Sequence, residues 1–89
     1  MTAMATYRVL YWQEIPSQIK AEDDDGVEAN VLMPPKFAAH IDDAAMERGL
    51  READDYLAQW RWSEEHERDG SAEEVAEAVR AELEASAEW

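Results

Sequence analysis

TYRVLYWQ, residues 6–13 of an 89-residue chain, is the segment around which the predicted sheet is built. Aromatic and β-branched residues fill it, which is typical of a β-strand. Because side chains alternate between the two faces of a strand, Tyr7, Val9 and Tyr11 share one face and Trp12 lies on the other. Both faces carry apolar residues. This pattern predicts a central strand that is covered at least partly on both sides.

The residues that follow predict two further strands. SQIKA (17–21) and VEANVLM (27–33) flank an acidic turn that ends in Gly26, which is the pattern of a β-hairpin. Pro16 supplies no backbone donor. We therefore expect the second strand to be short or to lie at an edge of the sheet.

The rest of the chain predicts helices and one more strand. Apolar residues recur at helical spacing from Pro35 until Gly49, which suits the residue after a helix end, and a second, short helix follows. WRW, residues 60–62, begins a last strand that runs toward Arg68, with its polar outer half at an edge or in a loop. Ser71 then opens a capping box that predicts a helix through residues 73–84.

These elements predict one α+β domain over residues 6–86. We expect a small antiparallel or mixed sheet of three to four strands, with three helices packed on one face. The expected order is strand, short strand, strand, helix, helix, strand, helix. Residues 1–5 are expected to form a flexible tail, and residues 87–89 a frayed C-terminus.

Charge and composition exclude several classes of function. The net charge is −14, from 22 acidic residues against 8 Lys and Arg. A field of this sign repels nucleic acid and anionic membranes, so neither is an expected partner. The chain has no Cys, which excludes thiolate metal sites and thiol nucleophiles and fits a cytoplasmic location. No run of residues is long and apolar enough for a membrane span.

Motifs for catalysis and cofactor binding fail on their spacing. The acidic turn cannot be an EF-hand loop, because Leu32 stands where the bidentate Glu belongs. His66 would need a second His where Gly70 stands, and His40 has no His partner at metal spacing. No Ser lies in a strand–turn–helix elbow, and the glycines are too scattered for a phosphate loop. We therefore predict no enzyme activity, no cofactor and no metal.

Surplus aromatic residues are the remaining candidates for a site. We expect the first strand and WRW to lie side by side, with either Trp12 or Trp62 partly exposed; the alternative is that both complete the core. The predicted partner- or ligand-binding residues are Tyr11, Trp12, Gln13, Lys36, Trp60, Arg61 and Trp62. The expected partner is another protein, with a homodimer as an alternative.

Four blocks of the sequence together resemble a known family. YWQEIPSQIKA, LMPPKFAAHIDDAAMERGL, DDYLAQWRW and GSAEEVAEAVRAELEA, between Thr6 and Ala85, are similar to the small bacterial domain family labelled virulence factor. The resemblance implies a domain that occurs alone or as a module of longer proteins with helical repeats. Its name describes a phenotype and transfers no catalytic residue.

Two functions stay open at this point. The first is a non-enzymatic protein-interaction or accessory module. The second is a small-ligand binder or accessory subunit, whose pocket would be lined by Tyr11, Trp12, Trp60 and Trp62 with Gln13 and Lys36 nearby. The resemblance associates stand-alone family members with folate- and corrinoid-dependent methyl transfer, which is the enzyme system that the second function would serve.

Overall fold

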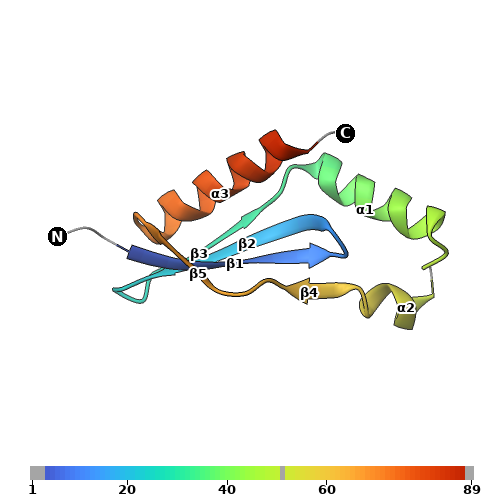
Figure 1. Ribbon diagram of the computed structural model, residues 1–89, viewed down its shortest axis with the longest axis horizontal. Helices are drawn as coiled ribbons and strands as arrows, with labels where there is room; N and C mark the ends of the chain where they lie inside the picture. The colour runs from blue at the N-terminus through green and yellow to red at the C-terminus, as the bar shows by residue number, and fades with distance from the viewer. Residues whose placement is uncertain (1–3, 51, 88–89) are drawn as a thin grey trace.

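A computed structural model describes residues 4–50 and 52–87 of the protein and confirms the α+β class (Figure 1). Its elements, in chain order, are β1 (Met4–Trp12), β2 (Ile15–Asp23), β3 (Glu28–Leu32), α1 (Pro35–Glu47), α2 (Ala53–Leu57), β4 (Trp60–Trp62), β5 (His66–Asp69) and α3 (Ala72–Ser86). The molecule is elongated, about 50 × 25 × 16 Å, because α1 and α2 extend beyond one end of the sheet (Figure 1).

The sheet is antiparallel and has five strands among the described residues, rather than three or four. β1 is central, as predicted: β2 pairs with one side of it, and β4 and β5 pair in succession with the other side. The single strand predicted from Trp60 toward Arg68 is divided at Ser63. There the backbone N–H of Val9 donates to Ser63 Oγ at 2.9 Å, and Ser63 N–H donates back to the Val9 carbonyl oxygen at 2.8 Å. A side-chain oxygen takes the place of a backbone carbonyl, which interrupts the ladder.

The prediction that the second strand is short or at an edge is wrong. β2 has nine residues and lies between β1 and β3. Pro16 is tolerated because it lies opposite Tyr11, next to the point where the β1–β2 register shifts. A central strand accepts proline at such an irregularity, where regular pairing is already broken.

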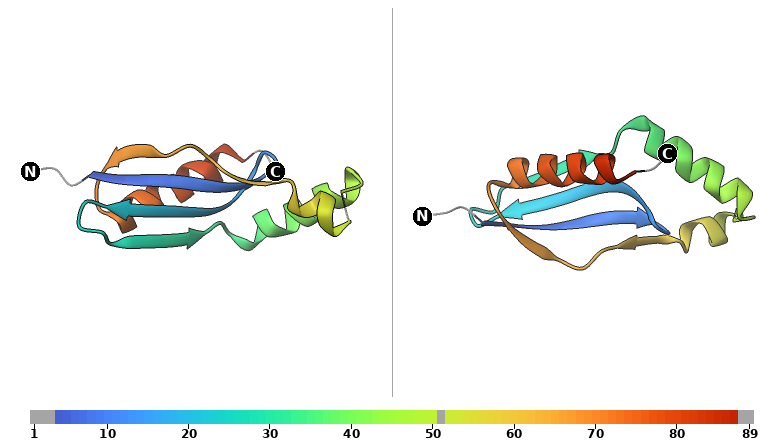
Figure 2. Two further views of the ribbon diagram at one scale, coloured as in Figure 1. Left: turned by 90° about the horizontal axis from the view of Figure 1, so that it is seen from below. Right: turned by 45° about the horizontal axis from the view of Figure 1, so that its top comes forward.

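One face of the sheet is covered by α3 (Figures 1 and 2). Val9 and Ile19 from the sheet and Val75 and Val79 from α3 are buried in the core. Tyr7 and Tyr11 pack against the same cluster and are partly buried, so this face of β1 points inward as predicted. Burying the side chain of each Val or Ile of this cluster stabilises the fold by about 1.5–3 kcal/mol.

The predicted capping box starts α3. Glu74 N–H donates to Ser71 Oγ at 3.2 Å, and Ser71 N–H donates to the Glu74 carboxylate at 3.4 Å. Glu82 of the same helix forms an ion pair with Arg68 of β5. The hydrogen bond from Arg68 holds the pKa of Glu82 below its usual range. α3 is thus fixed at its first turn and along one flank.

Helix α1 ends as its sequence predicts. Gly49 has φ +68°, its N–H donates to the Met46 carbonyl oxygen, and Leu50 N–H donates to the Ala45 carbonyl oxygen. These two bonds form a Schellman motif, which requires a left-handed residue at the position of Gly49. The chain then turns back into the short helix α2.

Three helices were expected on one face of the sheet. Among the described residues, α3 is the helix that covers this face. α1 contacts the start of β2 and then runs past the end of the sheet, and α2 follows it there (Figure 1). The opposite face of the sheet lies open over most of its length (Figure 2). We call it the open face.

The chain ends differ in part from the sequence prediction. Met4 and Ala5 belong to β1 rather than to a tail, because Ala5 is buried against the core. The rest of the predicted tail, residues 1–3, lies outside the described residues, as do residues 88–89 of the predicted frayed end. Ala87, just after α3, packs against the core.

Candidate functional site

The pairing of β1 with β4 brings most of the predicted site residues together, as expected. Across this pair, Leu10 lies opposite Trp62, Tyr11 opposite Arg61, and Trp12 opposite Trp60. Because strand side chains alternate, Arg61 shares the α3 face with Tyr11, and the two Trp residues of β4 point to the open face. The predicted residues are therefore distributed over two faces.

Trp12 lies on the open-face side of β1 but is fully buried. Its indole N–H donates to the Tyr56 carbonyl oxygen at 3.0 Å, and its ring lies 5.6 Å from the Tyr56 ring. Trp60 meets the same tyrosine edge-on at 6.0 Å. Burial raises the pKa of the Tyr56 hydroxyl, and the charge of Asp42 adds to this. Trp12 thus holds α2 against the sheet, so its ring has no surface for a partner.

On the α3 face, Arg61 and Tyr11 contact one another. The Arg61 guanidinium carbon lies 5.0 Å from the centre of the Tyr11 ring, within the range of a cation–π interaction. The guanidinium thus lies over the ring of a half-buried tyrosine. Arg61 itself is exposed.

Trp62 is the exposed aromatic residue of the open face. It is 45% exposed, against 0% for Trp12. The strand registers place Leu10 beside Trp62, Gln18 beside Leu10, and Leu32 beside Gln18. We call these four residues the Trp62 row. With neighbouring strands about 4.8 Å apart, the row extends about 14 Å across the sheet.

Charged side chains occupy the open face beyond the Trp62 row. The next row holds Arg8 and Lys20, opposite one another, and Arg8 forms an ion pair with Glu65 at 3.5 Å. One row further on, Glu22 lies directly opposite Glu28. The open face thus changes from apolar to cationic to anionic along the strands.

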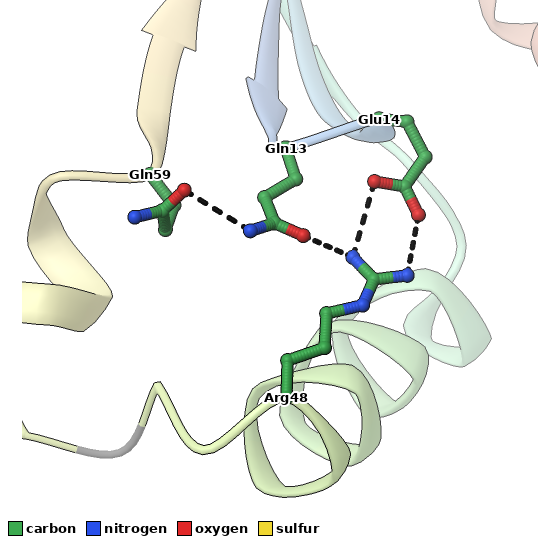
Figure 3. A network of polar contacts seen from close by, with 4 residues as sticks. All are labelled: Gln13, Glu14, Arg48 and Gln59. Carbon is green, nitrogen blue, oxygen red and sulfur yellow. Dashed lines mark hydrogen bonds and ion pairs between the residues drawn. The ribbon is translucent and has the colours of Figure 1, made fainter.

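Gln13 belongs to a polar network that ties the β1–β2 turn to α1 and α2 (Figure 3). Its side-chain amide donates to Gln59 Oε1 at 3.0 Å and accepts from Arg48. Arg48 also donates to both carboxylate oxygens of Glu14, at 2.6 and 3.1 Å, and holds the pKa of Glu14 below its usual range. Gln13 has φ +53°, which is uncommon for a residue other than glycine, and the network holds it there.

A separate cleft of about 420 Å³ lies between α1, α3 and the β1–β2 hairpin. Its lining residues are Tyr11, Glu14, Ile15, Pro16, Phe37, His40, Leu83, Ser86 and Ala87. Of the predicted site residues, Tyr11 is the one that it includes. Lys36 lies beside it on α1, with its ammonium 5.7 Å from the Phe37 ring centre. This cleft is therefore not the pocket predicted from the sequence, which Tyr11, Trp12, Trp60 and Trp62 would line.

The described part of the chain lacks two further features. No group of three or more His, Asp or Glu residues there is arranged to hold a metal ion. None of its helices is long and apolar enough to cross a membrane.

Several residues of these arrangements, among them Leu10, Leu32 and Arg48, were not predicted from the sequence. Leu32 carried a signal: it is apolar at a position where its strand alternation, through Glu28 and Asn30, points to solvent. Leu10 became part of the exposed row through its register with Trp62. Arg48 carried no signal, because its contacts with Gln13 and Glu14 span more than 30 residues of sequence.

The comparisons with known proteins identify a family. The sequence profile of the family described as virulence factor matches residues 10–88, which include the last three residues of β1, all of β4 and the helices α1, α2 and α3. No curated protein and no solved structure matches the chain. With almost its whole length matched, the protein belongs to the virulence factor family.

Proposed function

We propose that this protein is a cytoplasmic, non-enzymatic interaction module that binds a partner protein through the open face of its sheet. The observation that carries this is Trp62, 45% exposed beside Leu10 on a face that no helix of the described residues covers there. The absence of Cys supports the cytoplasmic location.

The Trp62 row has the composition of a protein contact. Trp is among the residues most enriched in interface hot spots, and Leu32, which is 70% exposed, lies at the other end of the row. An exposed large apolar group that could be buried in a partner is more informative than an exposed charge. The row has no ionisable group, so it offers packing and amide hydrogen bonds rather than acid–base chemistry.

The charged rows beside it would orient a partner. Arg8 and Lys20 are close to the Trp62 row, and Glu22 and Glu28 are one row further away. Rim charges of this kind steer association and fix register more than they add affinity. A partner face with an apolar centre and matching charges on one side suits this arrangement.

Affinity capture from the native host tests the proposal. The tagged wild type, Trp62→Ala and Leu57→Ala are compared by quantitative mass spectrometry. Leu57 is the matched control, because it is an apolar residue on α2 that is 63% exposed. The captured partner is then purified and its binding to the three proteins measured by calorimetry.

We expect Trp62→Ala to weaken binding by at least about tenfold, because truncating a hot-spot residue costs about 2 kcal/mol or more. Leu57→Ala should bind as the wild type does. Binding that both variants retain in full would show that the open face is not the contact.

The cleft supports a second candidate function, the binding of a small ligand. Its volume of about 420 Å³ is within the range of ligand sites, roughly 300–1,000 Å³, and Tyr11, Phe37 and Leu83 give it an apolar lining. Native mass spectrometry of the protein purified from its host tests this. A bound small molecule that Leu83→Trp displaces would favour the second candidate over the first.

A further inference from the structure

β3 forms an open border of the sheet. It stands at one end of the strand order β3-β2-β1-β4, and in Figure 2 (left) it lies along the lower border, before the chain enters α1. Leu32 at its end is 70% exposed, and Val27 just before it is 57% exposed. These are two of the most exposed large apolar side chains among the described residues.

The backbone of β3 has free groups on its outer side. Asp23 N–H donates to the Val27 carbonyl oxygen, and Met33 N–H donates to the Ser17 carbonyl oxygen. Hydrogen-bonded pairs alternate along an antiparallel ladder, so residues 29 and 31 bond to β2. The N–H and C=O groups of Glu28, Asn30 and Leu32 therefore point away from it, and within residues 4–50 and 52–87 they have no hydrogen-bond partner.

The opposite border of the sheet is unsuited to pairing. β4 has three residues and β5 has four, and the chain between them leaves the ladder at Ser63. Short, interrupted edge strands are a common protection against further pairing. β3 has five residues in unbroken register with β2, so a continuous row of outward groups exists on this side alone among the described strands.

We propose that β3 accepts an extended segment of a partner protein as an additional strand. This inference rests on the proposed function, because it names how a partner would be held beside the Trp62 row. The added strand would bond to the outward groups of Glu28, Asn30 and Leu32. Its side chains on the open face would continue the rows of the sheet by one position.

Charge and exposure define the chemistry of that segment. Glu28 lies directly opposite Glu22, and like charges so placed are destabilising. A Lys or Arg beside Glu28 would relieve this repulsion, and an apolar residue beside Leu32 would cover its exposed surface. Because Glu28 and Leu32 are four residues apart, the basic and apolar residues of the segment are also four apart.

A second copy of this chain fits the border poorly. Two copies that pair through β3 would bring together molecules of net charge −14. If the pair were centred on Asn30, each Glu28 would face the Leu32 of the other copy and would gain no opposite charge. A basic segment of another protein is favoured by both considerations.

A displayed library of randomised peptides, selected on the full-length protein, tests the proposal. Selected peptides are synthesised, and their affinity for the wild type, Asn30→Pro and Asn30→Thr is measured by fluorescence anisotropy. Proline at residue 30 removes an outward N–H and leaves the bonds to β2 in place. Threonine keeps the N–H, and both substitutions remove the Asn30 amide oxygen that accepts from the Gln18 side chain.

We expect the selected peptides to carry a basic and an apolar residue four apart and to shift the amide resonances of Glu28, Asn30 and Leu32. Asn30→Pro should lower the affinity for these peptides by about tenfold or more, and Asn30→Thr should leave it unchanged. A selection without β3-binding peptides, or equal binding by Asn30→Pro, would overturn strand addition. So would a wild-type dimer in sedimentation that Asn30→Pro dissociates, because the occupant would then be a second copy. A captured partner that Trp62→Ala releases and Asn30→Pro retains would leave the proposed function standing without this inference.

Discussion

Trp12 and Trp62 lie on the same face of the sheet, two residues apart in register, yet Trp12 is fully buried and Trp62 is 45% exposed. The difference comes from α2. The ring of Tyr56 packs on Trp12, and the Tyr56 carbonyl oxygen accepts its indole N–H. α2 itself lies past the end of the sheet, beyond β4 (Figure 1). The boundary between core and surface therefore passes between these two tryptophans.

Replacing the buried tryptophan should destabilise the fold strongly. We expect Trp12→Ala to lower the free energy of unfolding by about 3–5 kcal/mol, because it leaves a large cavity and frees the Tyr56 carbonyl. Trp12→Phe should cost less, since most of the ring volume remains. Urea unfolding followed by circular dichroism measures both; equal stability of Trp12→Ala and the wild type would contradict this assignment to the core.

The exposed tryptophan should matter little for stability. We expect Trp62→Ala to change the free energy of unfolding by less than about 1 kcal/mol, because much of its surface is already in water. The same urea titration supplies the measurement. A loss as large as that of Trp12→Ala would place Trp62 in the core and weaken its role in partner binding.

Ser63 should contribute more to stability than a typical edge residue. Ser63→Ala removes the acceptor for the N–H of Val9, and Val9 is buried. An unsatisfied buried donor costs about 1–3 kcal/mol in the free energy of unfolding. Ser63→Thr keeps the hydroxyl and is the control. Hydrogen exchange at the Val9 amide should be faster in the alanine variant alone; unchanged exchange would show that the hydroxyl is dispensable.

The capping box should be worth about 0.5–2 kcal/mol. Ser71→Ala leaves the Glu74 N–H without its side-chain acceptor at the start of α3. Ser86→Ala, at the other end of the helix, removes a hydroxyl that donates to the Glu82 carbonyl oxygen and serves as the control. Thermal unfolding compares the two, and a smaller loss for Ser71→Ala than for Ser86→Ala would argue against the capping role.

The pair of Glu14 and Arg48 should make a pH-dependent contribution to stability. The pKa of Glu14 is lowered in the folded protein, so its contribution is present above the unfolded value near 4.5 and is lost as pH falls through the folded pKa. We expect Glu14→Gln to melt below the wild type at pH 7 and to approach it at more acidic pH. The effect should be small, because Glu14 is largely exposed.

The control for this experiment is Glu64→Gln. Glu64 forms no ion pair with the described residues, so its replacement removes one negative charge from an acidic protein without breaking a bond. The difference in melting temperature between Glu64→Gln and the wild type measures the effect of general charge repulsion. The difference in melting temperature between Glu14→Gln and the wild type is corrected by subtracting that of Glu64→Gln. A corrected difference that does not shrink at acidic pH would contradict a stabilising Glu14–Arg48 pair.

Much of the fold could be predicted because its signals are local. The apolar spacing after Pro35, the left-handed position of Gly49 and the capping box of Ser71 each depend on neighbours within one or two helical turns. The adjacency of β1 and β4 was predicted from their aromatic content, which reflects side-chain packing rather than register. The position of β2 was not predicted, because the register shift that accommodates Pro16 arises from its pairing with β1.

The class of the domain, the start and end of α1, the start of α3, the acidic composition and the family could all be inferred from the sequence. The tertiary structure decided which tryptophan is exposed, where the last strand divides, and which border of the sheet stays open. The physical reason is the range of the interactions. Helix caps and hydrophobic periodicity act between near neighbours, whereas the burial of Trp12 depends on Tyr56, 44 residues away in the chain, whose placement only packing can fix.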